Sequence, residues 1–183
     1  MLTPPKLRPY RLSNKRVVGE HRIFRVEQQD VHSADGAPLR DVFTFACADW
    51  CNVVAVTPER ELVLVWQYRF GTEVLELETP GGTVDEGEDP ATTAARELRE
   101  ETGYEAERIE SLGVVSPNPA IQGNRCHLFL ATGCRKTSET DFDELEELEV
   151  ALVPEAYTAR LIDEGTVRHA IAVVALERFL RRR

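Results

Sequence analysis

The stretch GTVDEGEDPATTAARELREETGY, residues 82–104, constrains the fold of this chain more than any other segment. A helix over residues 90–102 would place Glu97, Glu100 and Glu101 at positions i, i+3 and i+4, on one face. Three carboxylates on one face repel each other and destabilise the helix unless a cation lies among them. Grouped oxygen ligands suit Mg²⁺ or Mn²⁺. The spacing therefore predicts a divalent-metal site on a helix.

Local signals at both ends support this helix. Asp89 suits the N-cap position, Pro90 loses no hydrogen bond in the first turn, and Gly103 is the expected stop. The apolar side chains of the helix form a narrow stripe that lets it pack close to a sheet. These side chains are Ala91, Ala94, Ala95 and Leu98.

Apolar patterns predict strands on both sides of this helix and two helices near the end of the chain. Residues 51–57 and 61–68 are nearly continuous apolar runs, which indicates strands buried on both faces. Residues 72–78 alternate, which indicates a strand with one face in water. The remaining expected elements are strands at 111–115, 126–131 and 148–153 and helices at 154–164 and 167–180, the last burying Ile171, Val174, Ala175 and Phe179. This order predicts an α/β layered sandwich.

The N-terminal part of the chain has a different pattern. Residues 1–16 are rich in Pro, Lys and Arg, and we expect an irregular arm there. Residues 21–32 and 40–48 alternate around an Asp-Gly turn, which is typical of an antiparallel hairpin. An isolated hairpin is barely stable in water, so it needs its own domain or a partner subunit. We therefore divide the chain into residues 1–49, the arm and hairpin, and residues 50–183, one globular domain.

Composition excludes several classes of function. The net charge of −10 argues against nucleic acid as a partner, because phosphate binding requires a basic surface. No apolar run is long enough to span a bilayer or to form a secretory signal, so we expect a soluble, cytoplasmic protein without a membrane partner. The cysteines form no CxxC pair, and we expect reduced, buried thiols. They are Cys47, Cys51, Cys126 and Cys134.

The stretch 82–104 resembles the Nudix box at every fixed position. Gly82 is followed after five residues by Glu88, and after seven more by RELREETGY. A chance match of seven fixed residues has a probability on the order of 10⁻⁸ per starting point. Tyr104 is aromatic where the family more often has an aliphatic residue. The resemblance implies the Nudix-type α/β/α sandwich with a mixed sheet, in addition to the N-terminal hairpin region.

The resemblance also implies roles for residues of the box. Divalent ions can neutralise the oxygens of a diphosphate, orient the attacking water and stabilise the leaving phosphate. By similarity to the family, Glu97 and Glu101 are the main metal ligands. Glu100 shares a second ion and takes part in catalysis, and Gly81 lends its backbone carbonyl to a metal. Arg96 supports catalysis by orienting the carboxylates. The alternative for this segment is a charged, solvated helix.

Residues on either side of the box resemble the branch that acts on ADP-ribose and other nucleoside diphosphate sugars. The lead-in is similar in QYR, which ends at Arg69, and in LETPGG, where Gly81 stands in place of the usual alanine. The resemblance places Arg69 and Glu78 at the substrate, with the guanidinium of Arg69 on the diphosphate. Pro119 lies about where this branch has its marker proline. A surface arginine and a plain proline-rich loop are the alternatives.

The acidic run DFDELEELE, residues 141–149, lies where related pyrophosphatases have a mobile catalytic loop. By this similarity Glu144 and Glu146 are the candidates for the catalytic base, and Glu146 is also a candidate metal ligand. Glu147 is a further candidate. A base in this loop would have to lie beside the metal-bound water. A solvated acidic loop is the alternative.

Two aromatic residues, Phe43 and Trp50, flank the junction between the hairpin and the first buried strand. In the same branch the hairpin commonly crosses to a second subunit, and aromatic residues there stack on the base of the substrate. The resemblance therefore implies a domain-swapped homodimer, with Trp50 as a platform for the nucleobase. Core packing is an equal alternative for Trp50.

The leading hypothesis is a Mg²⁺-dependent pyrophosphatase, with Mn²⁺ as the other suitable ion. It would split ADP-ribose or a related nucleoside diphosphate sugar into a nucleoside monophosphate and a sugar phosphate. One alternative is a hydrolase of damaged nucleoside triphosphates, which the lead-in and Pro119 disfavour. The other is a non-catalytic Nudix module that senses ADP-ribose. Such modules usually have an eroded box and a fused DNA-binding domain, whereas here the box is whole.

Overall fold

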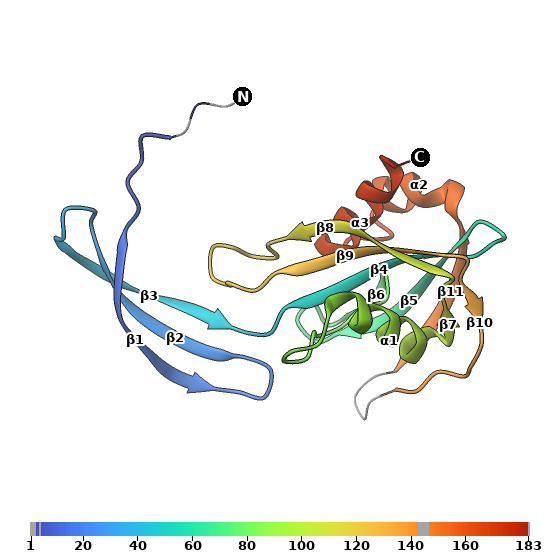
Figure 1. The fold of residues 1–183 in the computed structure, drawn as a ribbon, viewed down its shortest axis with the longest axis horizontal. Coiled ribbons are helices and arrows are strands. Elements are labelled where there is room, and N and C mark those ends of the chain that lie inside the picture. Colours follow the sequence, from blue (N-terminus) through green and yellow to red (C-terminus); the bar gives the residue numbers. More distant parts are fainter. Residues whose placement is uncertain (1–2, 4, 143–146, 183) are drawn as a thin grey trace. The chain divides into compact units, whose positions relative to one another are not determined.

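The chain forms two compact units, seen in a computed structural model that describes residues 3, 5–142 and 147–182. One unit contains Met1–Ala48 and Asn118–Asn124, and the other contains Asp49–Pro117 and Arg125–Arg183. The ribbon in Figure 1 shows a helix-free sheet in the first unit and a sheet with helices in the second.

The first unit contains a three-stranded antiparallel sheet in the order β1-β2-β3. Its strands are β1 (Arg11–Glu20), β2 (Arg25–His32) and β3 (Pro38–Ala46). The expected hairpin is present, but the expectation of an irregular arm over residues 1–16 is wrong from Arg11 onward. Polar cross-strand contacts hold β1 against β2, with Lys15 2.6 Å from Glu27 and Arg16 3.1 Å from Asp30. Because these contacts are polar, β1 lacks the alternating apolar residues that predict a strand.

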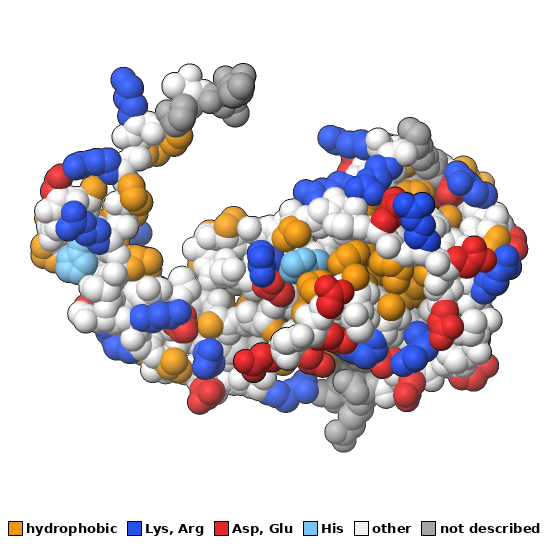
Figure 2. Space-filling model, in the orientation of Figure 1, with side chains coloured by type: hydrophobic (Ala, Val, Ile, Leu, Met, Phe, Trp, Pro, Cys, Tyr) orange, Lys and Arg blue, Asp and Glu red, His pale blue; other side chains and the backbone are white. Residues whose placement is uncertain are grey.

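This first sheet has almost no core of its own. Val31 is the one apolar side chain that is buried among the described residues of the first unit. Hydrophobic side chains instead lie on its surface (Figure 2). They include Leu12, Val17, Val18, Ile23, Leu39 and Phe43.

The second unit is built on a six-stranded mixed sheet in the order β11-β5-β4-β9-β8, with β6 paired to β5. Only the β4–β9 pair is parallel among the described strands of this sheet. The strands are β4 (Trp50–Val56), β5 (Glu61–Arg69), β6 (Val74–Glu78), β8 (Arg108–Val115), β9 (Cys126–Thr132) and β11 (Leu148–Pro154). A small separate pair is formed by β7 (Tyr104–Glu105) and β10 (Arg135–Lys136).

Helices cover both faces of this sheet, which confirms the expected α/β/α sandwich (Figure 1). On one face, Val53 and Ala55 of β4 pack in the same cluster as Leu98 of α1 (Pro90–Thr102). On the other, Val54 and Val56 share a cluster with α3 (Ala170–Leu180). The 3₁₀ turn η1 (Glu155–Tyr157) and the short α2 (Thr158–Asp163) connect β11 to α3.

Three expected faces differ from the structure. Ala95 is exposed on α1, and Thr93 and Glu101 are buried there instead. Val174 of α3 is exposed, whereas Ala175 and Phe179 of the expected stripe are buried together with Ala172 and Leu176. The strand β6 has no wet face at its end: Glu76, Leu77 and Glu78 are all buried. Alternation predicted exposed carboxylates there, but both are paired with cations from elsewhere in the fold.

Cys51, Cys126 and Cys134 have free thiols, as expected, whereas Cys47 is only partly buried. Cys51, Cys126 and Cys134 are buried, and burial raises the pKa of the Cys51 and Cys126 thiols to about 12. These thiols are therefore protonated at neutral pH and do not act as nucleophiles. Within the described part of the chain, none of the helices combines the length and the apolar character needed to cross a membrane.

Candidate active site

The acidic helix α1 has the ends that its sequence predicts. The carboxylate of Asp89 accepts hydrogen bonds from the N–H groups of Ala91 and Thr92 at 3.1 and 3.2 Å, and Pro90 occupies the first turn. Gly103 ends the helix in the left-handed conformation, with φ of 75°. These caps satisfy backbone groups that a helix end would otherwise leave unpaired.

The loop before the helix is fixed against β4 by backbone hydrogen bonds. Val53 N–H donates to Pro80 O, and Cys51 N–H donates to Gly82 O, each at 2.8 Å. Backbone groups of successive residues in an extended segment point to opposite sides. The N–H and C=O of Gly81 therefore lie on the side away from β4. There the N–H of Gly81 donates to Glu101 Oε2 at 2.9 Å.

Close packing of Gly82 against Glu97 joins this loop to the helix a second time. A Cβ atom built on Gly82 would lie 2.5 Å from Glu97 Cδ, so a side chain at this position would force the Glu97 carboxylate to move. The carboxylate of Glu97 thus lies directly over the backbone of the loop. The backbone of this loop therefore lies beside the carboxylates of Glu97 and Glu101 on α1.

Arg96 lies among the carboxylates of the box. Its Nη1 donates to Glu97 at 3.0 Å and to Glu100 at 2.9 Å, and its Nη2 donates to Glu88 at 3.3 Å. Burial alone would lower the pKa of Arg96, but the hydrogen bonds to Glu88 and Glu100 raise it above its ordinary value. Glu88 also accepts from Thr93 Oγ1 at 2.8 Å. Arg96 therefore supplies the cation that the clustered carboxylates require.

The donor atoms at this site fit a hard divalent cation. Glu97, Glu100 and Glu101 offer carboxylate oxygens, and Gly81 offers a carbonyl on the same side of the loop. In the described residues no three Asp, Glu, His or Cys side chains form a ready-made coordination shell. Hydrogen bonds to Arg96 and to the Gly81 N–H hold the carboxylates in this structure.

A cavity of about 960 Å³ extends from Gly81 and Gly82 to the segment before α3. Its volume lies in the range of small-molecule sites. Trp50, Asn52, Arg69, Thr72, Glu76, Glu78, Arg168, His169 and Ile171 are among the residues that line it.

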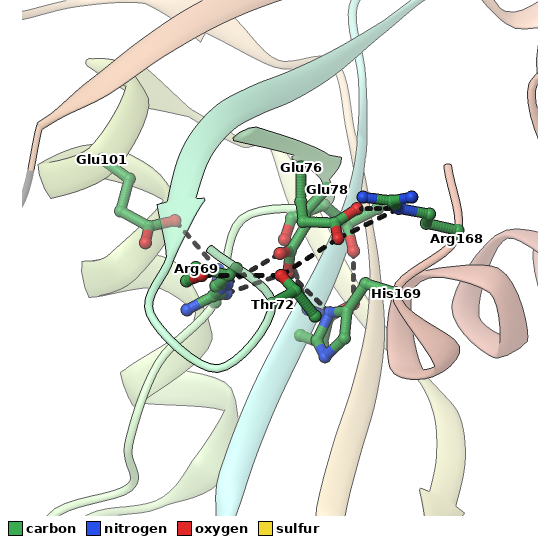
Figure 3. A network of polar contacts seen from close by, with 10 residues as sticks. Arg69, Thr72, Glu76, Glu78, Glu101, Arg168 and His169 are labelled. Carbon is green, nitrogen blue, oxygen red and sulfur yellow. Dashed lines mark hydrogen bonds and ion pairs between the residues drawn. The ribbon is translucent and has the colours of Figure 1, made fainter. Parts of the chain in front are cut away.

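One wall of this cavity is a network of ion pairs around Glu78 (Figure 3). Arg69 Nε and Nη2 donate to the two oxygens of Glu78 at 2.7 and 2.9 Å, and His169 Nδ1 lies 2.6 Å from Glu78 Oε2. Burial alone would raise the pKa of Glu78, but the bonds from Arg69 and His169 lower it to about 2. Glu78 is therefore ionised and holds Arg69 in one orientation.

A second pair lies next to the first in the same wall. Arg168 Nε donates to both oxygens of Glu76, at 3.0 and 2.8 Å, and Thr72 Oγ1 donates to Glu76 Oε1 at 3.3 Å. Hydrogen bonding to Arg168 lowers the pKa of Glu76. Figure 3 shows Glu76 and Arg168 pointing toward one another, from β6 and from the segment before α3.

Comparison with known proteins agrees with this arrangement. The NUDIX domain family matches residues 51–171 of the chain, which is more than half of it. The chain belongs to the Nudix family.

Relatives of this Nudix protein include the methanol dehydrogenase activator of Bacillus methanolicus, 37% identical over 160 residues that cover 85% of this chain and 84% of the relative. An ADP-ribose pyrophosphatase of Bacillus subtilis (strain 168) is 33% identical over 126 residues, which cover 68% of each chain. A crystal structure of an ADP compounds hydrolase is similar with a TM-score of 0.84 at 26% identity, covering 97% of this chain and 96% of that one.

Most of the predicted site residues of this Nudix protein lie at the cavity or on the acidic helix beside it. Trp50, Arg69, Glu78 and Gly81 line the cavity. The predicted site residues of the box, Arg96, Glu97, Glu100 and Glu101, contact one another or the loop beside the helix.

Pro119 and Phe43 are not among the residues that line the cavity. Pro119 belongs to the segment Asn118–Asn124 of the first unit, and Phe43 is exposed on β3 of that unit. Glu144 and Glu146 lie outside the described residues, and Glu147 is exposed. The roles expected for Pro119, Glu144 and Glu146 thus stay predictions.

Sequence reasoning missed Glu76, Arg168 and His169, which line the cavity of this Nudix protein. A signal was present in part, because Glu76 and Glu78 are two residues apart and share a face of a strand. No local signal links them to Arg168, which lies 92 residues from Glu76 in the chain.

Proposed function

We propose that this Nudix protein hydrolyses the diphosphate bond of ADP-ribose or a related nucleoside diphosphate sugar. The products would be a nucleoside monophosphate and a sugar phosphate. One observation carries the proposal: the loop that contacts Glu97 and Glu101 also forms one end of a cavity of about 960 Å³. Groups that suit a metal ion and space that suits a nucleotide sugar therefore adjoin.

The charges along the cavity support a divalent cation at its Gly81 end. Arg69 and Arg168 each face a buried, ionised glutamate, so these two ion pairs add little net positive charge to the cavity. A diphosphate needs more neutralisation than they supply. Mg²⁺ or Mn²⁺ bound there would neutralise the diphosphate oxygens and activate water.

Each chain residue has a proposed part in this reaction. Glu97, Glu101 and the Gly81 carbonyl would hold a metal, and Glu100 would share a second one. Arg96 orients Glu97 and Glu100 through its hydrogen bonds, since it already contacts both carboxylates.

Residues of the cavity and of the acidic loop would complete the site. Arg69 would contact the diphosphate from its fixed position on Glu78, and Trp50 would stack on the nucleobase. The catalytic base is proposed to be Glu144 or Glu146, with Glu146 as a further metal ligand, on the similarity of the acidic loop.

We also propose a homodimer formed through the first unit. Its sheet exposes several large apolar side chains and buries Val31 alone among its described apolar residues. A three-stranded sheet without a covered apolar face is only weakly stable in water. A second copy of the chain would cover it. The free thiols of Cys51, Cys126 and Cys134 are consistent with action in the reducing cytoplasm.

The test is incubation with a panel of nucleotide sugars and Mg²⁺, with released phosphomonoester as the readout. We expect turnover of at least one nucleotide sugar, and a loss of about 100-fold or more in Glu101→Gln, whose neutral amide is a poor metal ligand. Glu105→Gln, a change of an exposed glutamate on β7, is the matched control.

The proposal fails if no nucleotide sugar is turned over faster than by Glu101→Gln. A parallel panel of nucleoside triphosphates tests the alternative hydrolase. Faster turnover of a triphosphate than of every nucleotide sugar would favour that alternative.

A further inference from the structure

Two ionised glutamates in the wall of the cavity need a functional reason. Glu76 and Glu78 are 6% and 1% exposed, and the pKa of each carboxyl is lowered by its cationic partner. Removing charges from water costs much of the free energy that pairing them returns, so apolar side chains of similar volume would serve folding stability about as well. Paired charges that line a cavity instead mark a place where a ligand is recognised.

Arg168 has donors for which the described part of the chain provides no recorded partner. Its Nε donates to both oxygens of Glu76, which fixes the plane of the guanidinium. No acceptor is recorded for Nη1 or Nη2 of Arg168 among the described residues, and its side chain is 56% exposed at the cavity. A guanidinium held in this way presents two parallel N–H groups to a pair of neighbouring oxygen atoms.

The charges around Arg168 favour a neutral ligand group over an anionic one. Glu76 balances the charge of Arg168, and Glu78 lies two residues along the same face of β6. An anion placed here would gain from Arg168 and lose to both carboxylates, and the diphosphate proposed at Arg69 needs a metal ion for the same reason. Two neighbouring hydroxyl oxygens accept from the guanidinium without that loss, and a hydroxyl can also donate to Glu76 or Thr72.

We infer that Arg168, oriented by Glu76, is a specificity-determining residue that binds the vicinal hydroxyl groups of a ribose. This inference rests on the proposed function, because it assigns a part of the substrate to the wall of the cavity that contains Arg168. ADP-ribose carries such a pair of hydroxyls in its adenosine and another in its terminal sugar. The shared chemistry is the ribose diol, and the experiment distinguishes the two sources.

The experiment compares ADP-ribose with two analogues, one that contains 2′-deoxyadenosine and one that has 2-deoxyribose as the terminal sugar. Kd is measured in EDTA for each, and kcat/KM with Mg²⁺. The wild type should prefer ADP-ribose over one of the analogues by about 10- to 100-fold, since a hydrogen bond to a charged group is lost. The analogue that loses affinity shows which ribose Arg168 binds.

Two variants assign this preference to Arg168. Arg168→Met removes all donors, and Arg168→Lys keeps a positive charge beside Glu76 but loses the paired N–H groups. Both should reduce the preference to within about twofold. Arg160→Met is the control. Arg160, on α2, donates from its Nε to Glu164 at 2.8 Å in a similar way, and it is not among the residues that line the cavity. Thermal melting checks the fold of each variant.

The inference is overturned if the wild type binds all three compounds alike, if it binds none, or if Arg168→Lys keeps the wild-type preference. Failure of the proposed function has a different signature, which is absence of turnover with Mg²⁺. The Kd ratios in EDTA still decide the role of Arg168 in that case.

Discussion

Near the site, ion pairs and hydrogen bonds between charged groups hold the side chains of Arg96 and Glu78 in place. Arg96 bonds to three glutamates of the box, and Glu78 contacts Arg69 of β5 and His169 of the segment before α3. Each such residue fixes its partners in one geometry. At the residue scale, therefore, the site depends on the ionisation state of a few buried carboxylates.

Glu78 makes a testable contribution to stability at low pH. Its pKa is about 2 in the folded protein and 4.5 ordinarily, so its contribution is complete above pH 4.5 and disappears as the pH falls toward 2. The shift corresponds to about 3 kcal/mol. We expect Glu78→Gln to lose less free energy of unfolding than the wild type between pH 5 and pH 2. Urea unfolding at each pH measures this.

Glu86→Gln is the control for this experiment, because Glu86 is exposed in the turn before α1. Other carboxyl groups with a lowered pKa, such as Asp49, remain in every variant, so all of them lose some stability in acid. Parallel pH profiles for Glu78→Gln and the wild type would contradict the expectation.

At the scale of elements, the site is the junction of one loop and one helix. Residues 80–82 bond to β4 through their backbone, and Glu97 and Glu101 approach the same residues from α1. Since loop and helix are both fixed, the space between them sets where the carboxylate of Glu97 lies.

Gly82→Ala tests this junction. The added methyl group would overlap the Glu97 carboxylate, which is the flexible end of a side chain and can rotate away. We expect turnover to fall about 100-fold, since a displacement of about 1 Å at a reacting group has that effect. The melting temperature should change little. Activity on the nucleotide sugar and thermal melting are measured together.

Gly123→Ala is the matched control for Gly82→Ala, because nothing lies within 4 Å of a Cβ at Gly123. Full activity in Gly82→Ala would show that the position of Glu97 over the loop is not needed for the reaction.

At the scale of the whole molecule, the first unit differs from the second in how its apolar residues are covered. The second unit buries apolar clusters on both faces of its sheet, whereas the first leaves several large apolar side chains exposed. A dimer would remove these side chains from water.

The proposed homodimer can be tested on the full chain by sedimentation at several concentrations. We expect a dimer for the wild type, and a shift toward monomer when Val17 and Phe43, which are 52% and 53% exposed, are both replaced by Asp. Burying an unpaired carboxylate in an interface costs several kcal/mol, about enough to dissociate a moderate dimer. Leu152→Asp, at an exposed residue of β11 in the second unit, is the control. A monomeric wild type at every concentration would contradict the proposal.

Local chemistry in the sequence determined the helix α1 and the face that carries Glu97, Glu100 and Glu101. Caps act within a few residues, and the helical repeat fixes which side chains share a face, so neither needs the rest of the fold. The buried runs of β4 and β5 were predictable for a similar reason, because continuous apolar sequence has few alternatives to burial.

Only the tertiary structure decided what faces the acidic helix and what lines the cavity. The strand β1 was not predicted, because charged cross-strand pairs hold it in place of apolar contacts. The exposed face expected for β6 was wrong, because its glutamates are buried in ion pairs with Arg69 and Arg168. Glu76 and Arg168 are 92 residues apart in the chain. They meet because the packing of α3 against the sheet brings the segment before this helix beside β6. The order of residues states each local preference, but the contacts between distant residues follow from how the layers pack.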